Sequence, residues 1–203
     1  TTTATVTLTL NGVVGSDSVS STNGATFSQS DVGTGLTATV NSITLTGDDA
    51  GNYTISSGQT DTADITQKAL GYTVDASNKT YDGTDAATVT LTLNRLVTGE
   101  TLTATAIATF DSANVGTRTA TVNSITLTDG TGDADNYSIS TGGTDSASIT
   151  QKALTYTVDA NDKTYDGTRS ATATLSLSGL VGSETLDVTN TATFANATAG
   201  DNK

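Results

Sequence analysis

The hexapeptide KTYDGT occurs twice in this chain, at residues 79–84 and again at residues 163–168. A catalytic motif needs one copy, whereas a motif that belongs to a repeated domain recurs with each domain. Other segments recur at nearly the same separation. They are QKAL at 67–70 and 151–154, VNSITLT at 40–46 and 122–128, and Asn-Tyr at 52–53 and 136–137. The chain is therefore predicted to be an array of repeats of about 84 residues.

The repeat divides the sequence into one whole copy and two partial copies. Residues 68–151 form the complete repeat. Residues 1–67 form a partial repeat that lacks its first strand, and residues 152–203 form a partial repeat with the first half only. These are called the first (1–67), second (68–151) and third (152–203) copies below. A natural protein rarely begins and ends inside a folding unit, so we expect the chain to be an excerpt from a longer array.

Within the whole repeat, apolar residues alternate with polar ones, as in strands that bury one face. The clearest runs are residues 87–93 and 102–110, and two shorter runs at 120–122 and 125–127 are expected as separate strands. No stretch keeps the spacing of three and four residues that an amphipathic helix requires. Seven short strands in about 84 residues are typical of an immunoglobulin-type sandwich. The predicted fold is all-β, with tandem immunoglobulin-like antiparallel β-sandwich repeats.

A short segment before one predicted strand has a recognisable spacing. Asp49 to Tyr53 fits D-x-G-x-Y, which opens the sixth strand of immunoglobulin-like sandwiches, where the tyrosine hydroxyl bonds back onto the backbone in a tyrosine corner. The second copy has Tyr137 at the same position, with Asp135 in place of Gly. We expect Tyr53 and Tyr137 to form such corners. The alternative is an ordinary turn followed by a strand tyrosine. Ile55 and Ile139, two residues further on, are expected in the core.

The hexapeptide lies between the first and second predicted strands of its copy. Asp-Gly favours a turn because Gly adopts positive φ without steric cost. Its tyrosines are expected to cover one end of each sandwich with an aromatic ring. The predicted corner residues are Tyr81, Asp82 and Gly83 in the second copy and Tyr165, Asp166 and Gly167 in the third.

Carboxylates gather in the loops that precede the two corner tyrosines. Calcium takes six to eight oxygen ligands, and such loops supply them. The sequence therefore offers a candidate calcium site, although neither loop matches an EF-hand. The alternative is a solvated acidic loop, and no other cofactor is implied. The candidate ligands are Asp48 and Asp49 in the first copy and Asp129, Asp133 and Asp135 in the second.

The charge and the missing residue types exclude several classes of function. The chain has a net charge of -13 and only eight Lys and Arg residues, so it is not expected to contact nucleic-acid phosphates. It has no His or Cys, and Glu100 and Glu184 occupy equivalent positions in different copies, so we expect no catalytic site. No apolar run approaches the roughly 20 residues of a membrane-spanning helix. We therefore expect no membrane insertion.

The order of motifs resembles a known family. ALTYTVDANDKTYDGT, GLVGSETL and TATF, together with LTGDDAGNYTIS and ASITQKAL, resemble the YDG repeats of large bacterial surface exoproteins. These repeats occur in filamentous-haemagglutinin-like adhesins and biofilm-matrix proteins. The resemblance covers essentially the whole chain. It implies an extracellular stalk at the bacterial cell surface, with binding to host or matrix glycans or proteins through other regions. Gln67 and Gln151 depart from the Pro expected in many members.

The predicted function is structural. We expect a stalk or fibre segment of a bacterial extracellular adhesin or matrix protein, which supplies length and stiffness and has neighbouring repeats as its partners. The first alternative is a self-assembling extracellular fibre subunit, whose partial copies are completed by strand exchange between chains. The second alternative is a carbohydrate- or protein-binding module.

Overall fold

A computed structural model describes residues 1–200 of the chain. These residues form an all-β structure of several small sheets with two single-turn 3₁₀ helices and no α-helix, which confirms the all-β part of the prediction. Among them, no helix has the length and apolar character needed to cross a membrane. Residues 201–203, the end of the third copy, lie outside the described residues.

Several elements recur at equivalent positions from copy to copy. Those of the first copy are β1 (Thr3–Ala4), β2 (Ser20–Phe27), β3 (Gly33–Thr46), η1 (Ala50–Asn52) and β4 (Thr60–Ile65). Those of the second copy are β5 (Lys68–Ala69), β6 (Gly71–Ala76), β7 (Lys79–Thr80), β8 (Ala86–Ala87), β9 (Val89–Asn94), β10 (Leu102–Phe110), β11 (Gly116–Asp129), η2 (Ala134–Asn136), β12 (Tyr137–Ser138) and β13 (Thr144–Thr150). The described part of the third copy contains β14 (Thr155–Ala160), β15 (Ser170–Ala171), β16 (Ala173–Ser178) and β17 (Ala192–Thr193).

By compactness, the chain divides into two units, each assembled from three stretches. Unit 1 consists of Thr1–Tyr72, Leu93–Ala104 and Thr126–Ser140. Unit 2 consists of Thr73–Thr92, Thr105–Ile125 and Thr141–Lys203. The division falls inside strands β10 and β11, so the units do not follow the copies predicted from the sequence. The boundaries of those copies stay predictions.

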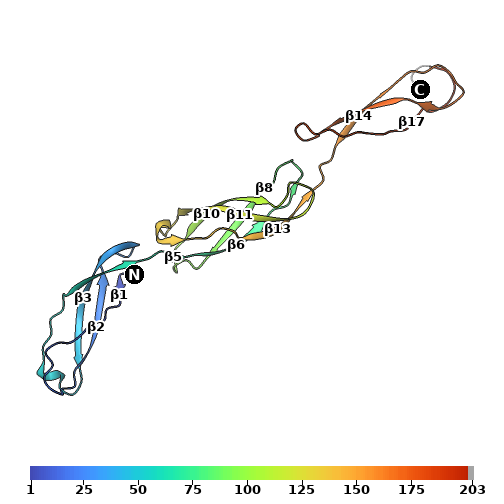
Figure 1. Cartoon of the computed structure of the whole chain (residues 1–203). Helices are drawn as coiled ribbons and strands as arrows, with labels where there is room; N and C mark the ends of the chain where they lie inside the picture. The colour runs from blue at the N-terminus through green and yellow to red at the C-terminus, as the bar shows by residue number, and fades with distance from the viewer. Residues whose placement is uncertain (201–203) are drawn as a thin grey trace. The chain divides into compact units, whose positions relative to one another are not determined.

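Unit 1 contains a four-stranded antiparallel sheet in the order β1-β2-β3-β4, drawn from blue to cyan in Figure 1. Its core is made mostly of small side chains, because the inward positions of these strands carry Ala more often than Leu or Ile. The buried residues are Ala4, Ala25, Ala38 and Val40, with Val6, Leu8, Phe27 and Ile43 packed against them. Strand β12 also lies in this unit and pairs in parallel with β5.

A β-bulge explains the repeated segment VNSITLT. The register between β2 and β3 shifts between Gly24 and Ala25, and Asn41 is the extra residue on β3. Because side chains alternate between the two faces of a strand, one extra residue moves the inward set from even to odd positions. Val40 is buried before the bulge and Ile43 is half-buried after it.

The bulge also corrects one sequence expectation. The change of phase in this segment favoured two separate short strands, whereas the structure has a single strand of 14 residues in each case, β3 and β11. The bulge asparagine is fixed by a bond across the strands. Asn41 Nδ2 donates to Thr26 Oγ1 at 2.9 Å, and Asn123 Nδ2 donates to Thr109 Oγ1 at 3.0 Å.

Unit 2 contains most of a five-stranded sheet in the order β7-β13-β11-β10-β8. Strand β13 lies between β7, to which it is parallel, and β11, to which it is antiparallel, so it is an interior strand of the sheet. Ile149 of β13 is 1% exposed. The buried cluster is Phe110, Ala120, Ala147 and Ile149, with Ala76, Tyr81, Ala87 and Val89 packed against it.

The third copy repeats the strand pairing of the second without its buried core. Strands β15 and β17 pair as β8 and β10 do, and β14 pairs with β16. No residue from 152 to 200 is buried, and Tyr156 is 64% exposed. The cover of the second copy comes from β11 and β13, and in the described part of the third copy, residues 152–200, no strand follows β17 to take their place.

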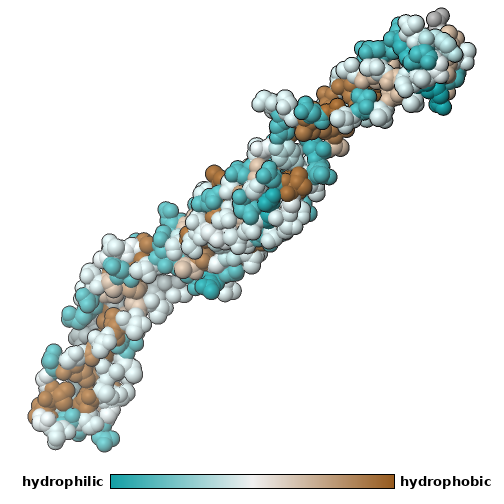
Figure 2. Space-filling view, turned by 45° about the vertical axis from the view of Figure 1, so that its right-hand side comes forward, coloured by the Kyte–Doolittle hydropathy of each residue, from teal (hydrophilic) through white to brown (hydrophobic). Residues whose placement is uncertain are grey.

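Threonine fills most outward positions of the strands. It is β-branched, which suits a strand, and its hydroxyl is readily solvated. On the face shown in Figure 2, apolar brown surface is accordingly confined to small patches between white and teal residues.

Candidate functional site

The lysine of KTYDGT is the centre of its turn. Lys79 Nζ donates to Asp82 Oδ1 at 2.9 Å, to Thr84 O at 2.7 Å and Thr84 Oγ1 at 3.1 Å, and to Ala86 O at 3.0 Å. The same ammonium lies 5.9 Å from the centre of the Phe110 ring, a cation–π distance. The side chain is only 18% exposed. One cation therefore holds together the turn, the strand after it and an aromatic residue of β10.

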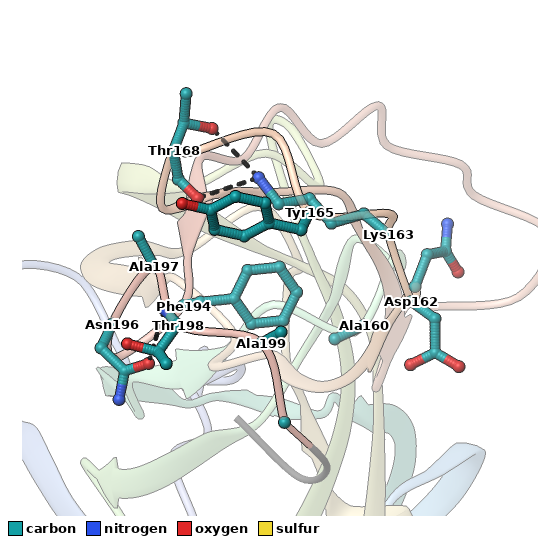
Figure 3. A pocket seen from close by; sticks show the side chains of 12 residues that line it. Ala160, Asp162, Lys163, Tyr165, Thr168, Phe194, Asn196, Ala197, Thr198 and Ala199 are labelled. Carbon is teal, nitrogen blue, oxygen red and sulfur yellow. Dashed lines mark hydrogen bonds between the residues drawn. The ribbon is translucent and has the colours of Figure 1, made fainter.

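The third copy builds the same arrangement, as Figure 3 shows. Lys163 Nζ donates to Asp166 Oδ1 at 2.8 Å, to Thr168 O at 3.1 Å and to Thr168 Oγ1 at 3.0 Å. It lies 5.8 Å from the centre of the Phe194 ring. Since residues 152–200 include no buried residue, this turn forms from its local sequence and the facing strand alone.

The aspartate of the motif accepts several hydrogen bonds at one oxygen. Asp82 Oδ1 accepts from the backbone N–H and the hydroxyl of Thr84, each at 2.9 Å, in addition to the lysine. The lysine hydrogen bond, followed by the two bonds from Thr84, lowers the pKa of Asp82 to about 2. The pKa of Asp166 is lowered to about 2 by the equivalent partners.

The tyrosine of the motif contacts a different copy. Tyr81 is half-buried against the core of unit 2, and its hydroxyl donates to the carboxylate of Glu184 in the third copy. That hydrogen bond is the main cause of a raised pKa of Tyr81. Tyr165 was expected to cover one end of its domain in the same way, but it is 67% exposed.

The glycine of the motif leaves room for the same neighbour. Gly83 has φ +79°, and a Cβ placed there would lie 2.9 Å from Val181 Cγ1, so a larger residue would require this valine to shift. Gly167 has φ +76°, but a Cβ there would meet nothing within 4 Å among the described residues. The KTYDGT turn of the second copy therefore packs against the loop Val181–Glu184 of the third copy.

This loop recurs in all three copies and is called the acid loop below. Its members are Val14–Asp17 (VGSD), Val97–Glu100 (VTGE) and Val181–Glu184 (VGSE). In each, the backbone N–H of the acidic residue donates to the carbonyl of the valine, at 3.0, 3.0 and 3.1 Å, which closes a turn. Sequence reasoning noticed Glu100 and Glu184 only as an unsuitable catalytic pair. Their recurrence after a valine and near glycine was the available signal for a turn.

The corner tyrosines also bind acid loops. Tyr137 donates its hydroxyl to Glu100 and accepts from the backbone N–H of Val97 at 3.1 Å. Tyr53 donates to Asp17 Oδ2 at 2.6 Å and accepts from the N–H of Val14 at 2.9 Å. The hydroxyls therefore do reach backbone groups, but these lie 40 and 39 residues upstream. An immunoglobulin tyrosine corner bonds only a few residues upstream.

The surroundings of these two hydroxyls raise their pKa values. Burial comes first for Tyr137, followed by the hydrogen bond to Glu100. For Tyr53 the hydrogen bond to Asp17 is the largest cause. Neither isoleucine expected in the core is buried: Ile55 is 41% exposed and Ile139 is half-buried.

Three of the aspartates proposed as calcium ligands accept hydrogen bonds from backbone N–H groups. Asp49 Oδ2 accepts from the N–H of Ser18 at 2.9 Å, and Asp129 Oδ1 accepts from that of Ala134 at 2.7 Å. Asp133 Oδ1 accepts from the N–H of Asp135 at 2.9 Å. Within residues 1–200, no three metal-ligating side chains come together as a metal site would need, Asp48 included. The calcium site stays an untested candidate, with a solvated acidic loop as its alternative.

Unit 1 contains a second set of contacts between copies. Asn136 Oδ1 accepts from the N–H of Val32 at 2.8 Å, and Asn136 Nδ2 donates to Asp31 Oδ1 at 3.1 Å. Gln67 Nε2 donates to the carbonyl of Asp135 at 3.0 Å. The corner loop of the second copy thus binds both a hairpin and the end of the first copy.

A profile of the YDG domain matches the chain three times, at residues 1–63, 66–146 and 150–203. The chain belongs to the YDG domain family. Each match contains one acid loop, and the second and third each contain one KTYDGT turn, so the contacts of Tyr81 and Gly83 with the loop Val181–Glu184 connect two YDG domains. The chain matches no curated protein and no solved structure.

Proposed function

We propose that the chain is a structural segment of a bacterial extracellular stalk or fibre, built from tandem immunoglobulin-like YDG domains of about 84 residues. The observation that carries the proposal is the contact of Tyr81 and Gly83 with the acid loop of the next copy. A motif present once per domain that contacts the following domain makes a joint that can be repeated without limit. Such an array gains stability from interfaces between neighbours.

The sandwich reading is supported by the second copy. It pairs β6 with β9 and has a separate five-stranded sheet, as two facing layers require. The strand pairs of the second copy recur in the third, with Ala171 opposite Ala192 where Ala87 faces Ala108. This recurrence is what tandem copies of one domain would give.

Stiffness would come from the joints. Tyr81 contributes a charge-assisted hydrogen bond, which is stronger than a neutral one. Gly83 leaves room for the Val181 side chain of the third copy. The net charge of -13 would keep neighbouring stalks apart by mutual repulsion. No catalytic step is part of this proposal.

Pulsed spin-label distance measurement tests the stiffness. The chain has no Cys, so a variant with both Thr105→Cys and Thr174→Cys carries spin labels at these two positions and nowhere else. A narrow distance distribution is expected, and it should broaden when Tyr81→Phe and Glu184→Gln are added. Tyr156→Phe, at an exposed tyrosine, is the matched control and should change nothing. A broad distribution in the unaltered chain would contradict a stiff segment.

The alternative of a fibre subunit completed by strand exchange has its own support. The third copy has an open cavity of about 800 Å³ lined by residues that include Lys163, Tyr165 and Phe194 (Figure 3). The equivalent surface of the second copy is covered by β13, where Ile149 pairs with Lys79. Under this alternative, a strand from another chain would fill the cavity.

The mass of the native polypeptide under denaturing conditions separates the two proposals. A mass far above the 20.3 kDa of this chain supports a covalent stalk. A mass close to that value supports the subunit.

A further inference from the structure

A segment near the start of the second copy lies parallel to the last strand of that copy. Strand β7 pairs with β13 in the same direction, Lys79 with Ile149 and Thr80 with Thr150. All the strands from β8 to β12 lie between these two in the sequence. The pairing therefore joins the first part of the folded copy to the last, and both strands belong to unit 2.

Two side chains make this contact longer than the two residues of β7. The N–H of Ser148 donates to Asn78 Oδ1 at 2.6 Å, just before β7 begins. The N–H of Ala76 donates to Asp145 Oδ2 at 2.8 Å, near the start of β13. Side-chain oxygens thus continue the row of hydrogen bonds beyond the backbone pairing of the two strands.

The hydrogen bonds keep one parallel register from end to end. The N–H of Tyr81 donates to the carbonyl of Thr150 at 2.8 Å, and Thr150 Oγ1 donates to the carbonyl of Lys79 at 3.3 Å. The bonded partners are 69 to 71 residues apart in the sequence along the whole contact. The two segments that these bonds join, residues 76–81 and 145–150, are called the parallel contact below.

Both segments of the parallel contact are fixed in the fold of unit 2. Ile149 is 1% exposed and belongs to the buried cluster that contains Phe110. Strand β13 is also paired with β11 on its other side. Lys79 binds its own turn and lies over the Phe110 ring. Neither segment can therefore slide along the other without breaking the hydrogen bonds that they share.

The parallel direction decides how tension acts on these hydrogen bonds. The start of one strand and the end of the other lie at opposite ends of a parallel contact. Tension along the chain reaches the contact before Ala76 and leaves it after Thr150, so it pulls the two segments in opposite directions along their axes. The hydrogen bonds then carry the load together and have to break together. In an antiparallel hairpin the two free ends lie side by side, so tension opens one bond after another.

We propose that the parallel contact is a mechanical clamp, which keeps the second copy folded when the chain is pulled from both sides. The proposal rests on the proposed function, because a stalk segment carries tension along the chain. It adds the element that bears the load. Opening of the clamp frees the chain between Tyr81 and Asp145, which adds roughly 200 Å of extended length. The clamp thus sets the tension at which the segment lengthens.

Single-molecule pulling in two directions tests the clamp. The chain has no Cys, so pairs of introduced cysteines are its only attachment points. Ser77→Cys with Gln151→Cys applies the force at opposite ends of the parallel contact and shears it. Ser77→Cys with Thr144→Cys applies the force at one end of the contact and peels it open. All three positions are exposed, and both pairs bypass the pairing of β6 with β9.

The force that unfolds the second copy should be several-fold higher in shear than in peeling at the same loading rate. Equal forces would overturn the proposal. The spin-label distances described above report stiffness and do not depend on the clamp. Equal forces with a narrow distance distribution would remove the clamp and leave the stalk standing. A broad distribution would count against the stalk even where the two forces differ.

A matched pair of substitutions tests the side chains of the clamp. Asn78→Ala removes the bond from the N–H of Ser148, whereas Asn123→Ala removes the 3.0 Å bond to Thr109 Oγ1 between β10 and β11. Loss of one hydrogen bond in the clamp should raise the rate of unfolding under constant shear force about fivefold. Asn123→Ala should lower the equilibrium stability as well but leave that rate nearly unchanged. Equal rates for the two variants would overturn the proposal, because the whole sheet would then share the load.

Discussion

Replacing Lys79 with Met tests the account of the KTYDGT turn most directly. The substitution keeps a long unbranched side chain but removes the ammonium that binds Asp82, Thr84 and Ala86. Lys79 is 18% exposed and Asp82 is 52% exposed, so the carboxylate regains water while the carbonyls next to the lysine regain less. The lysine therefore contributes mainly through its bonds to those carbonyls.

The expected loss of free energy of unfolding in Lys79→Met lies between two limits. Hydrogen bonds to a charged group are worth about 1.5–3 kcal/mol each when they cannot be replaced by water. Exposed ion pairs are worth about 0.2–1 kcal/mol, and a cation–π contact at this exposure about 0.5–1 kcal/mol. Since water replaces part of what is lost, we expect the free energy of unfolding to fall by about 2 kcal/mol.

Calorimetry and circular dichroism measure this effect. A domain of this size shifts its melting temperature by about 4–8 °C for each kcal/mol. Lys68→Met, at an exposed lysine, makes the same change of charge and serves as the control. Lys163→Met should affect the third copy and leave the transition of the second unmoved. A melting temperature for Lys79→Met equal to that of Lys68→Met would refute the reasoning.

Three further predictions follow from the same contacts. Because the pKa values of Asp82 and Asp166 are lowered to about 2, below the usual value of about 3.9, their contribution to stability is present above pH 4 and is lost as the pH falls toward 2. Asp82→Asn should make the melting temperature depend less steeply on pH between pH 4 and pH 2. The same pH dependence as in the unaltered chain would contradict this. Arg95 has φ +68° at the position where the other copies have Gly12 and Gly179, and a positive φ is unfavourable for any residue with a Cβ. Arg95→Gly should therefore raise the free energy of unfolding by about 1 kcal/mol. A loss of stability would contradict this. Millimolar calcium and then chelator should leave the melting temperature unchanged, because the loop carboxylates already accept backbone N–H groups; a rise with calcium would restore the metal site.

The local elements could be predicted because their residue patterns occur in more than one copy of the repeat. The period of two in residues 102–110 follows from the alternation of faces in a strand, and β10 occupies 102–110. Asp-Gly in KTYDGT fixes a turn because of the positive φ of Gly83. The bulge at Asn41 was missed, since a single extra residue breaks the alternation in the sequence and leaves the strand continuous.

The partners of the tyrosines could not be predicted, because they lie far away in sequence. Tyr137 and Glu100 are 37 residues apart, and Tyr81 and Glu184 are 103 apart. The order of motifs along the chain says nothing about which loops meet in space. The lysine was overlooked for a different reason: an exposed-looking Lys next to Asp resembles an ordinary surface pair until the carbonyls around it are seen.

The sequence by itself determined the repeat, the period of the strands and the position of the KTYDGT turns, because these depend on neighbouring residues. Only the tertiary structure decided what the turns do. Lys79 organises its own turn, whereas Tyr81 and Gly83 are turned toward the acid loop of the next copy. The physical reason is that a hydrogen bond or a close side-chain contact depends on which surfaces the folded strands bring together, and chain order does not specify that.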